Sequence, residues 1–374
     1  MPKIASARIQ DHFVELTDPR RRKVTYPLIN IVTIAICAVL CGADDFVSIA
    51  EYGRKKRRWL GQFLDLRSGI PSHDRFNAVL GAIKPAEFEA CLLSWITALH
   101  ELTAGQVVAI DGKTLRRSFD AASRKSALHM VSAWATANQI SLGQVAVAEK
   151  SNEITAIPQL LKVLEIAGCL VTIDAMGCQT EIAQAVLDAG AHYVLAVKRN
   201  QPALYDGLER HFIAAQVRCV DMPVQTYASA EAGHGRQERR SYFITPVPDD
   251  LPDRRRWSQL TAVGMVIRDT LRNGQPSYER QYYILSKKLS ARQFAAAVRQ
   301  HWSIENGLHW QLDVTFQEDH SRLRRGHADA NFSILRRTAL SLLKNHHRLK
   351  VGVKNKRLAA GWDDEYRAQV LFGQ

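Results

Sequence analysis

The sequence predicts an α/β protein, in which an RNase H-like mixed β-sheet core follows a helical N-terminal domain and is interrupted by a β-rich insertion. Three observations support this class. The first hundred or so residues place apolar side chains at helical spacing. Beyond them, short β-rich runs alternate with two helices, and a long later segment reads again as strands. With 374 residues, the chain exceeds the roughly 250 to 300 at which one core stops growing.

The helical domain is expected over residues 1–104. Ser72 follows a proline turn and is placed to cap the third of four predicted helices. Short helices that carry Arg57, Arg58 and Arg75 are consistent either with a DNA reader of the helix-turn-helix type or with a structural helical cap. The four helices are predicted at 29–40, 46–64, 72–83 and 85–102.

The sheet core is expected over residues 105–216 and 287–346. Three consecutive strands are followed by helix, strand, helix and strand, and this is the element order of an RNase H-like fold. A further helix is predicted at 329–345. In chain order, the core elements are strands 107–110, 129–135 and 140–148, helix 156–167, strand 170–173, helix 181–189 and strand 193–197.

The β-rich insertion is expected over residues 217–286, because a structureless loop of that length is uncommon in a compact domain. The pair Asn273-Gly274 is a strong hairpin signal. Residues 347–374 are expected to form a basic C-terminal tail. The predicted strands of the insertion are 225–230, 239–245, 260–268 and 281–286.

Three acids stand where a two-metal phosphoryl-transfer site requires them. Asp111 and Asp174 each follow an apolar run that reads as a strand, and Glu305 lies in a segment of helical periodicity. For any one of them, a turn or cap role is the more common explanation. The three in this order favour catalysis: Asp111 would bridge two ions, Asp174 would hold one and Glu305 would complete the other. Such sites take Mg²⁺, and we expect Mn²⁺ to substitute.

The charge of the chain favours a polyanionic partner. Lys and Arg number 50 against 37 Asp and Glu, which gives a net charge of +13. Runs of basic residues are spread along the whole length, although a single run is usually a solvated face. Nucleic acid is therefore the first candidate partner and an anionic membrane surface the second.

Several other classes are disfavoured. The first fifteen residues mix charged and polar groups, so we expect no signal peptide. The longest apolar stretch, 27–42, is shorter than the roughly 18 to 20 residues that span a bilayer. Six scattered Cys match neither a zinc pattern nor a secreted disulfide framework. We expect a protein of the reducing cytoplasm.

Five segments in register resemble the H-repeat-associated (ISAs-type) insertion-sequence transposases of bacteria. They are 110–116, 172–179, 198–202, 301–310 and 318–319, and the similarity extends over nearly the full chain. The resemblance implies a DDE transposase with an RNase H-like core, in which Asp111, Asp174 and Glu305 match the metal-binding acids. It also implies double-stranded DNA as substrate, both at the element's terminal inverted repeats and at the target, and a homodimer on DNA at the bacterial nucleoid.

The wider group often places Tyr, Arg and Lys seven before, four before and seven after the catalytic Glu. Here Val298, His301 and Leu312 stand at those positions, so the resemblance does not decide whether the hairpin step that those residues support in relatives is used. His301 is still expected to contact phosphate.

Further DNA-contacting residues are expected near the acids and in the basic runs, each with a solvated face as the alternative. Asp313 is a rival for the third acid. His309 would either assist proton transfer or pack behind the acids, and Trp302 and Trp310 are expected in the core. The expected DNA contacts are Lys113, Arg116, Lys198, Arg199, Asn200, His301, Arg322 and Arg324, in addition to the three arginines of the helical domain.

Two other functions are also consistent with the sequence. The chain would bind DNA without cutting it if it were a decayed or domesticated copy. It would cut without joining strands if it were a structure-specific nuclease built on the same core. Metal-dependent cleavage separates the first alternative from a transposase, and strand joining separates the second.

Overall fold

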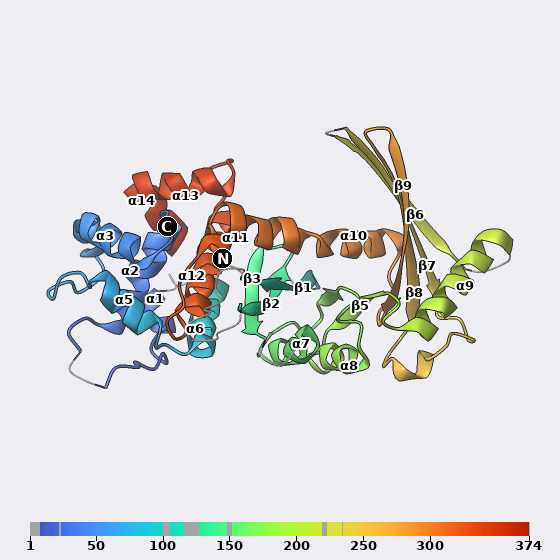
Figure 1. Ribbon diagram of the computed structural model, residues 1–374, viewed down its shortest axis with the longest axis horizontal. Coiled ribbons are helices and arrows are strands. Elements are labelled where there is room, and N and C mark those ends of the chain that lie inside the picture. Colours follow the sequence, from blue (N-terminus) through green and yellow to red (C-terminus); the bar gives the residue numbers. More distant parts are fainter. Residues whose placement is uncertain are drawn as a thin grey trace, which may run out of the picture.

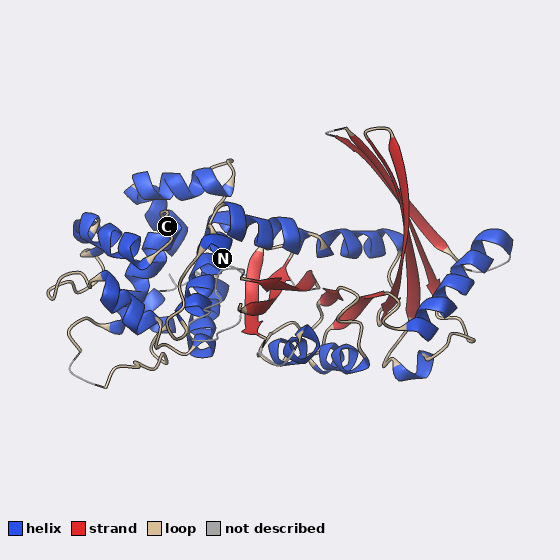
Figure 2. Cartoon of the chain, in the orientation of Figure 1, coloured by secondary structure: helices blue, strands red, loops and turns tan. Residues whose placement is uncertain are grey.

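The computed structural model describes residues 8–21, 24–99, 105–115, 127–147, 152–218, 223–233 and 235–373, with the side chains of 215–218 left out. The molecule is elongated (Figure 1). A helical body occupies one end of the molecule, short strands lie in the middle, and long strands lie toward the other end (Figure 2).

The helical body combines elements from both ends of the chain. Its core is α2, in which every residue from Asn30 to Leu40 is buried, and α12, which packs on α2 and α6. Residues 347–374, for which we expected a basic tail, contain two helices that pack into this body. The helices are α1 (Ile9–His12), α2 (Leu28–Leu40), α3 (Phe46–Lys55), α4 (Arg57–Leu60), α5 (His73–Leu80), α6 (Pro85–Leu99), α12 (Ala328–Asn345), α13 (Val353–Trp362) and α14 (Asp364–Phe372).

Capping residues explain where two of these helices begin. The Ser72 side chain accepts a hydrogen bond from the backbone N–H of Arg75, as the sequence predicts, and Asp45 caps α3 in the same way. The prediction of a single helix at 46–64 is wrong, because the helix is interrupted at Lys56 and forms two helices, α3 and α4.

The first five strands have the RNase H-like order β3-β2-β1-β4-β5, which confirms the predicted fold class. The pairs β1–β2 and β2–β3 are antiparallel, whereas β1–β4 and β4–β5 are parallel. We expected the first strand to stop before Asp111, but pairing with β2 carries it to Thr114. The strands are β1 (Val107–Thr114), β2 (His129–Ala135), β3 (Ile140–Ala146), β4 (Leu170–Ile173) and β5 (His192–Val197).

The insertion extends this sheet. Strand β9 pairs antiparallel with β5, so the order continues as β9-β8-β7-β6 and the sheet has nine strands. Asn273 and Gly274 both have positive φ between β8 and β9, which confirms the predicted hairpin. A helix that the sequence pattern did not indicate, α9 (Pro202–Arg218), precedes the insertion. The four strands are β6 (Gln225–Gly233), β7 (Arg236–Pro246), β8 (Ala262–Arg272) and β9 (Gln275–Leu285).

Helices cover the two faces of the sheet differently. Val108 and Ile110 of β1 pack with α7 (Glu153–Leu161) and α8 (Thr180–Asp188), whereas Ala109 packs in the same core as α12. Because side chains alternate along a strand, Asp111 and Lys113 face the α12 side. On that side, α10 (Ala291–His301), a π-helical turn (Glu305–His309) and α11 (Trp310–Val314) run across the sheet (Figure 1).

The described helices include none that is both long and apolar enough to cross a membrane. The five cysteines in the described part of the chain are all free thiols.

Candidate active site

The three acids line a single cavity of about 470 Å³. In the parallel pair of strands, Ile110 lies beside Ile173, so the residues that follow them, Asp111 and Asp174, occupy neighbouring positions at the edge of β4. Asp174 also has the turn role that such an acid commonly has, because its Oδ1 accepts hydrogen bonds from the N–H groups of Met176 and Gly177 at 3.1 and 3.3 Å. Asp174 therefore both stabilises the turn and lines the cavity.

Glu305 reaches the cavity from a π-helical turn instead of the regular helix that we expected. The turn follows α10 and continues into α11, and Leu308 and Leu312 pack it into the core. Single π-turns inserted between α-helical segments are frequent at functional sites. Trp302 and Trp310, which we expected in the core, are 42% and 53% exposed, so that prediction is wrong.

Asp111, which lines the cavity, and His309, which lies beside Asp111, both have pKa values far from their ordinary ones. Burial raises the pKa of Asp111 to about 7, and the carboxylates of Asp174 and Glu305 add to the rise. His309 Nδ1 lies 3.4 Å from Asp111 Oδ2. Burial, together with Arg337 and Lys113, lowers the pKa of His309 to about 3, so its imidazole is neutral at neutral pH.

Asp111→Asn should stabilise the metal-free protein at high pH. The folded-state pKa of about 7 lies above the 3.8 of the unfolded chain, so the folded state binds the extra proton. The free energy of unfolding of the wild type should therefore fall as pH rises from about 4 to about 7 and stay lower above it. Thermal unfolding in EDTA should show a higher melting temperature for the variant at pH 8 and a much smaller difference at pH 4.5. Equal differences at both pH values would contradict this assignment.

The donor set of the cavity suits a hard cation, because it consists of carboxylate oxygens that repel one another. As the side chains lie, however, no group of three or more His, Cys, Asp or Glu among the described residues is gathered closely enough to hold a metal ion. The three acids share a cavity without converging on one point. Binding of a cation would therefore require their side chains to move together.

Lys113 is not placed for the phosphate contact that we expected. Its side chain is 9% exposed and forms ion pairs with Asp313 on α11 and with Glu318, whose Oε2 lies 2.8 Å from Nζ. Glu318 in turn accepts a hydrogen bond from Ser333 Oγ at 2.8 Å and pairs with Arg337 at 3.4 Å, both on α12. We call Lys113, Asp313, Glu318, Ser333 and Arg337 the buried ion network. Asp313 thus has a structural partner outside the acid cavity. Glu305 lines that cavity with Asp111 and Asp174, and Glu279, which also lines it, pairs with Arg268.

The loop after β5 lies at the rim of the cavity. Lys198 and Arg199 are exposed and line it, as a role in phosphate binding requires. Asn200 has a different role, since its Nδ2 donates to the Ala175 carbonyl at 2.7 Å and ties this loop to the one after Asp174. His301 Nδ1 is 3.1 Å from Thr172 Oγ1, and burial lowers the pKa of this imidazole.

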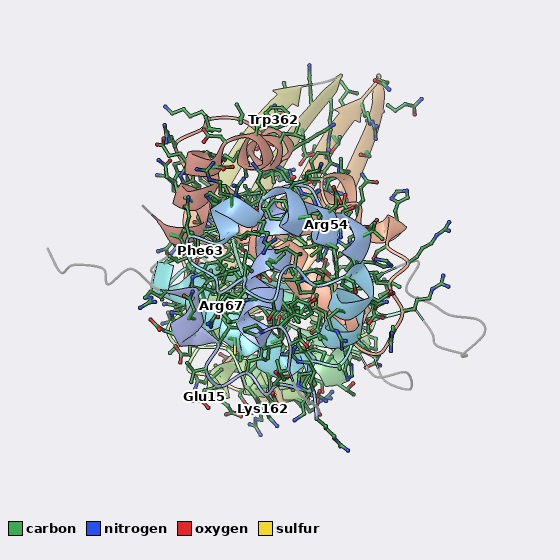
Figure 3. The ribbon with its side chains drawn as sticks, turned by 90° about the vertical axis from the view of Figure 1, so that its left-hand side faces the viewer. Glu15, Arg54, Phe63, Arg67, Lys162 and Trp362 are labelled. Atoms are coloured by element: carbon green, nitrogen blue, oxygen red, sulfur yellow. The ribbon has the colours of Figure 1, made fainter. Side chains whose placement is uncertain are left out.

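The remaining predicted DNA contacts lie elsewhere. Arg57, Arg58 and Arg75 are exposed on α4 and α5 of the helical body, at the end of the molecule that Figure 3 faces, where Arg54 and Arg67 are also at the surface. Arg322 is exposed and Arg324 is half-buried in the segment before α12. Arg116 lies outside the described residues.

Comparisons with known proteins identify the family of the chain. The Transposase DDE domain family matches residues 103–342, and the DDE_Tnp_1-associated family matches residues 10–96. The chain belongs to the DDE transposase family. The first match contains Asp111, Asp174 and Glu305, and the second covers most of the N-terminal helices.

Full-length relatives support the assignment. The chain is similar to two proteins of Escherichia coli (strain K12), the H repeat-associated putative transposases YhhI and YbfD. It is 38% identical to YhhI over 372 residues, which cover 98% of each chain, and 38% identical to YbfD over 247 residues, which cover 66% of this chain and 97% of YbfD. Among solved structures, a piggyBac transposase synaptic complex with hairpin DNA is similar at 11% identity and a TM-score of 0.44, covering 98% of this chain and 77% of that one.

Proposed function

We propose that this transposase cuts DNA at the ends of an insertion sequence and joins the freed ends to target DNA, in a reaction that depends on Mg²⁺, with Mn²⁺ able to substitute. The observation that carries the proposal is the single cavity lined by Asp111, Asp174 and Glu305, which come from β1, the end of β4 and the π-helical turn of an RNase H-like sheet. Carboxylates from separate elements are the usual way to hold ions that assist phosphoryl transfer.

In this proposal Asp111 would contribute to holding both ions, Asp174 would hold one and Glu305 would complete the site of the other. The ions would stabilise the attacking and leaving oxygens of an in-line displacement. Their charge would also offset the burial and, to a smaller extent, the neighbouring carboxylates that raise the Asp111 pKa to about 7. Neutral His309, 3.4 Å from Asp111, adds no positive charge that would compete with a cation.

The reaction consists of two displacements at one site. In cleavage, a water oxygen bonds to the scissile phosphorus as the bond to the 3′ oxygen breaks, and this leaves a 3′-hydroxyl and a 5′-phosphate. In joining, that 3′ oxygen bonds to a phosphorus of the target as the target's bond to its own 3′ oxygen breaks. Lys198 and Arg199 at the cavity rim are proposed to bind phosphates beside the scissile bond.

We propose that other parts of the chain bind DNA and a second subunit. The helical domain of residues 1–104 is proposed to bind DNA through Arg57, Arg58 and Arg75, which are exposed on α4 and α5. Bringing two element ends together favours a homodimer on DNA, acting at the bacterial nucleoid in the cytoplasm. We propose that residues 105–216 and 287–346 form the catalytic core, that residues 217–286 form the insertion and that residues 347–374 form the C-terminal segment.

The test is cleavage and joining of a labelled end of the flanking element with Mg²⁺ or Mn²⁺, with Asp111→Asn and Asp174→Asn as controls. The proposal expects metal-dependent cleavage and joining in the wild type and neither in the variants. DNA binding without cleavage by the wild type would favour a DNA-binding relic. Cleavage that needs no element end and yields no joined product would favour a structure-specific nuclease.

A further inference from the structure

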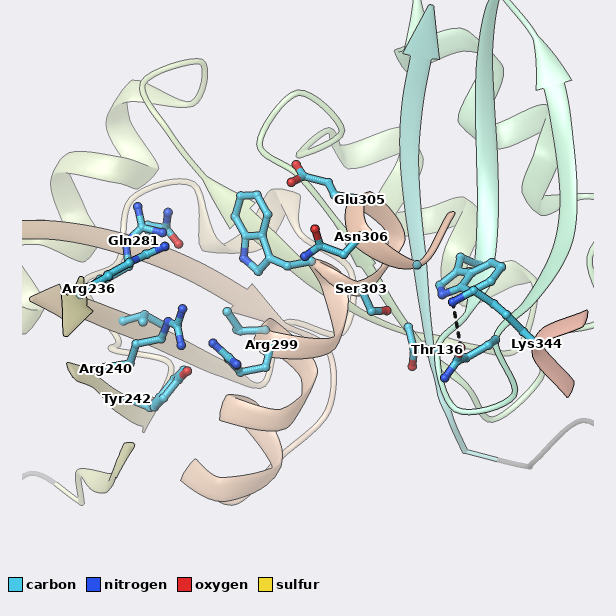
Figure 4. Close-up of a pocket in the computed structure, with 17 residues that line it drawn as sticks. Thr136, Arg236, Arg240, Tyr242, Gln281, Arg299, Ser303, Glu305, Asn306 and Lys344 are labelled. Carbon is cyan, nitrogen blue, oxygen red and sulfur yellow. Dashed lines mark hydrogen bonds between the residues drawn. The ribbon is translucent and has the colours of Figure 1, made fainter. Parts of the chain in front are cut away.

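A second cavity, of about 600 Å³, lies beside the acid cavity. It is formed by one face of β7–β9, by α10 and the π-helical turn, and by the β2–β3 turn with the end of α12. Figure 4 shows Arg236, Arg240 and Arg299 on one side of it and Lys344 on the other, with Glu305 and Asn306 between them. Gln281, Val298, Trp302 and Glu305 line both cavities, so the two are neighbours across a shared wall.

The lining of this second cavity is cationic. Arg236, Arg240, Arg268, Arg299 and Lys344 contribute five positive charges against the single carboxylate of Glu305, and we call it the arginine cavity. Arg240 of β7 lies directly opposite Arg268 of β8. Like charges in such a cross-strand pair destabilise a sheet. Binding of an anion to this face of the sheet would explain why it carries two arginines opposite each other.

The carboxylates that pair with these arginines fall into two kinds. Glu238 is buried and pairs with both Arg236 and Arg240, which holds the two guanidinium groups in place. Glu231, which pairs with both Arg299 and Arg240, and Glu279, the partner of Arg268, are 55% and 43% exposed. Ion pairs this exposed contribute about 0–1 kcal/mol, so a phosphate can replace either carboxylate at little cost.

Trp302 adds an aromatic face to the shared wall. Its indole is 42% exposed, although it stands only three residues before Glu305. Proteins that hold a nucleic-acid strand combine cationic grooves, which follow the backbone, with aromatic side chains, on which bases stack. The two features occur together here at the border between the acids and the arginines.

We propose that the arginine cavity binds the backbone of the DNA strand that continues from the scissile phosphate, with a base of that strand stacked on Trp302. This inference rests on the proposed function for its substrate and names the path of that substrate across the protein. A phosphate at Asp111 and Glu305 then places the phosphates next to it against Arg299 and Arg268. The β-rich insertion thereby supplies a strand-binding surface for the catalytic core.

The test is the affinity of the full-length protein for a fluorescein-labelled element end in EDTA, measured by anisotropy over a range of salt concentrations. Arg299→Ala with Arg268→Ala should weaken binding by about tenfold or more, since each guanidinium–phosphate interaction is charge-assisted. It should also lower the slope of log affinity against log salt by about 0.7–0.9 for each phosphate that the variant no longer neutralises. Arg299→Lys should retain the slope.

Arg254→Ala is the matched control. Arg254 and Arg299 are both 41% exposed, and each pairs with one carboxylate, Asp249 at 2.7 Å and Glu231 at 2.6 Å. Arg254 lies outside the arginine cavity, and its removal should leave affinity and slope nearly unchanged. Trp302→Ala should weaken binding without changing the slope, and Trp302→Phe should restore it. All variants should keep the melting temperature of the wild type within a few degrees.

Two results would overturn the proposal: a double variant that binds as tightly as the control, or one whose salt slope equals that of the wild type. Because binding in EDTA does not depend on chemistry, the outcomes separate this inference from the proposed function. Weakened binding in a protein that never cleaves DNA would uphold the arginine cavity and reject the transposase reaction. If the wild type cleaves and joins DNA but the double variant binds DNA as tightly as the wild type, the transposase reaction is upheld and the arginine cavity is rejected.

Discussion

Glu318→Ala should destabilise the protein by about 3–5 kcal/mol, which is the typical cost of leaving a buried ion pair without one partner. Glu318 is 2% exposed and contacts Lys113, Ser333 and Arg337. Its removal leaves buried Arg337 without the carboxylate with which it pairs and leaves Lys113 with Asp313 alone. Although burial by itself raises the pKa of Glu318, Arg337 and Lys113 hold it at about 2. Denaturant unfolding at pH 7, followed by circular dichroism, measures the effect.

Glu279→Ala is the control for that experiment. Glu279 also pairs with an arginine, Arg268, but is 43% exposed, so its removal should change the free energy of unfolding by less than about 1 kcal/mol. The stability contributed by Glu318 should be present above pH 4.5 and be lost as pH falls toward 2, since its folded-state pKa is depressed. A destabilisation by Glu318→Ala no larger than that by Glu279→Ala would contradict the role of the buried ion network.

The buried ion network also fixes the position of the third acid. Asp111 and Lys113 are two residues apart on β1, a rise of about 6.6 Å, and their partners His309 and Asp313 are four residues apart on the helical segment, a rise of about 6 Å. The matching distances set the helical segment in one register against β1. Glu305, one helical turn before His309, is thereby carried to the acid cavity.

Glu305→Gln should reduce strand cleavage by about 10³-fold or more with DNA binding retained. A charged ligand of a catalytic ion accounts for several kcal/mol of transition-state stabilisation, and each 1.4 kcal/mol is about tenfold in rate. Asp313→Asn should reduce cleavage by less than about tenfold, because Lys113 keeps its ion pair with Glu318. Single-turnover cleavage of the element end under saturating protein measures both variants.

Each variant in that pair controls for the other, because both replace one carboxylate by its amide within nine residues of the same helical segment. The opposite result, in which Asp313→Asn abolishes cleavage and Glu305→Gln leaves it intact, would make Asp313 the third acid. Equal and small effects would place the chemistry outside the acid cavity.

The order of the core elements could be predicted because local patterns encode it. Apolar runs of four to seven residues separated by turn signals identify the strands, and the parallel pairing of β1 with β4 brings Asp111 and Asp174 to neighbouring positions in such a fold. The hairpin at Asn273-Gly274 follows from turn chemistry alone. These features depend on interactions within a few residues or on a topology with few alternatives.

The features that could not be predicted from the sequence depend on contacts between residues far apart along the chain. Lys113 lies beside a predicted catalytic acid and looks like a phosphate ligand, but its partners are 200 and 205 residues away along the chain. The union of β5 with β9, which makes the insertion part of the catalytic sheet, is likewise a pairing of distant segments. The arginine cavity has the same origin, since Arg240, Arg268 and Arg299 meet only in the folded chain.

The most direct test of the central claim is to titrate Mn²⁺ into the DNA-bound protein at pH 8 and to follow free Mn²⁺ by electron paramagnetic resonance. We predict that the wild type binds about two ions per subunit. We also predict that each of Asp111→Asn, Asp174→Asn and Glu305→Gln fails to bind at least one of them, with DNA binding unchanged. Wild-type stoichiometry in all three variants would contradict a metal site formed by these acids.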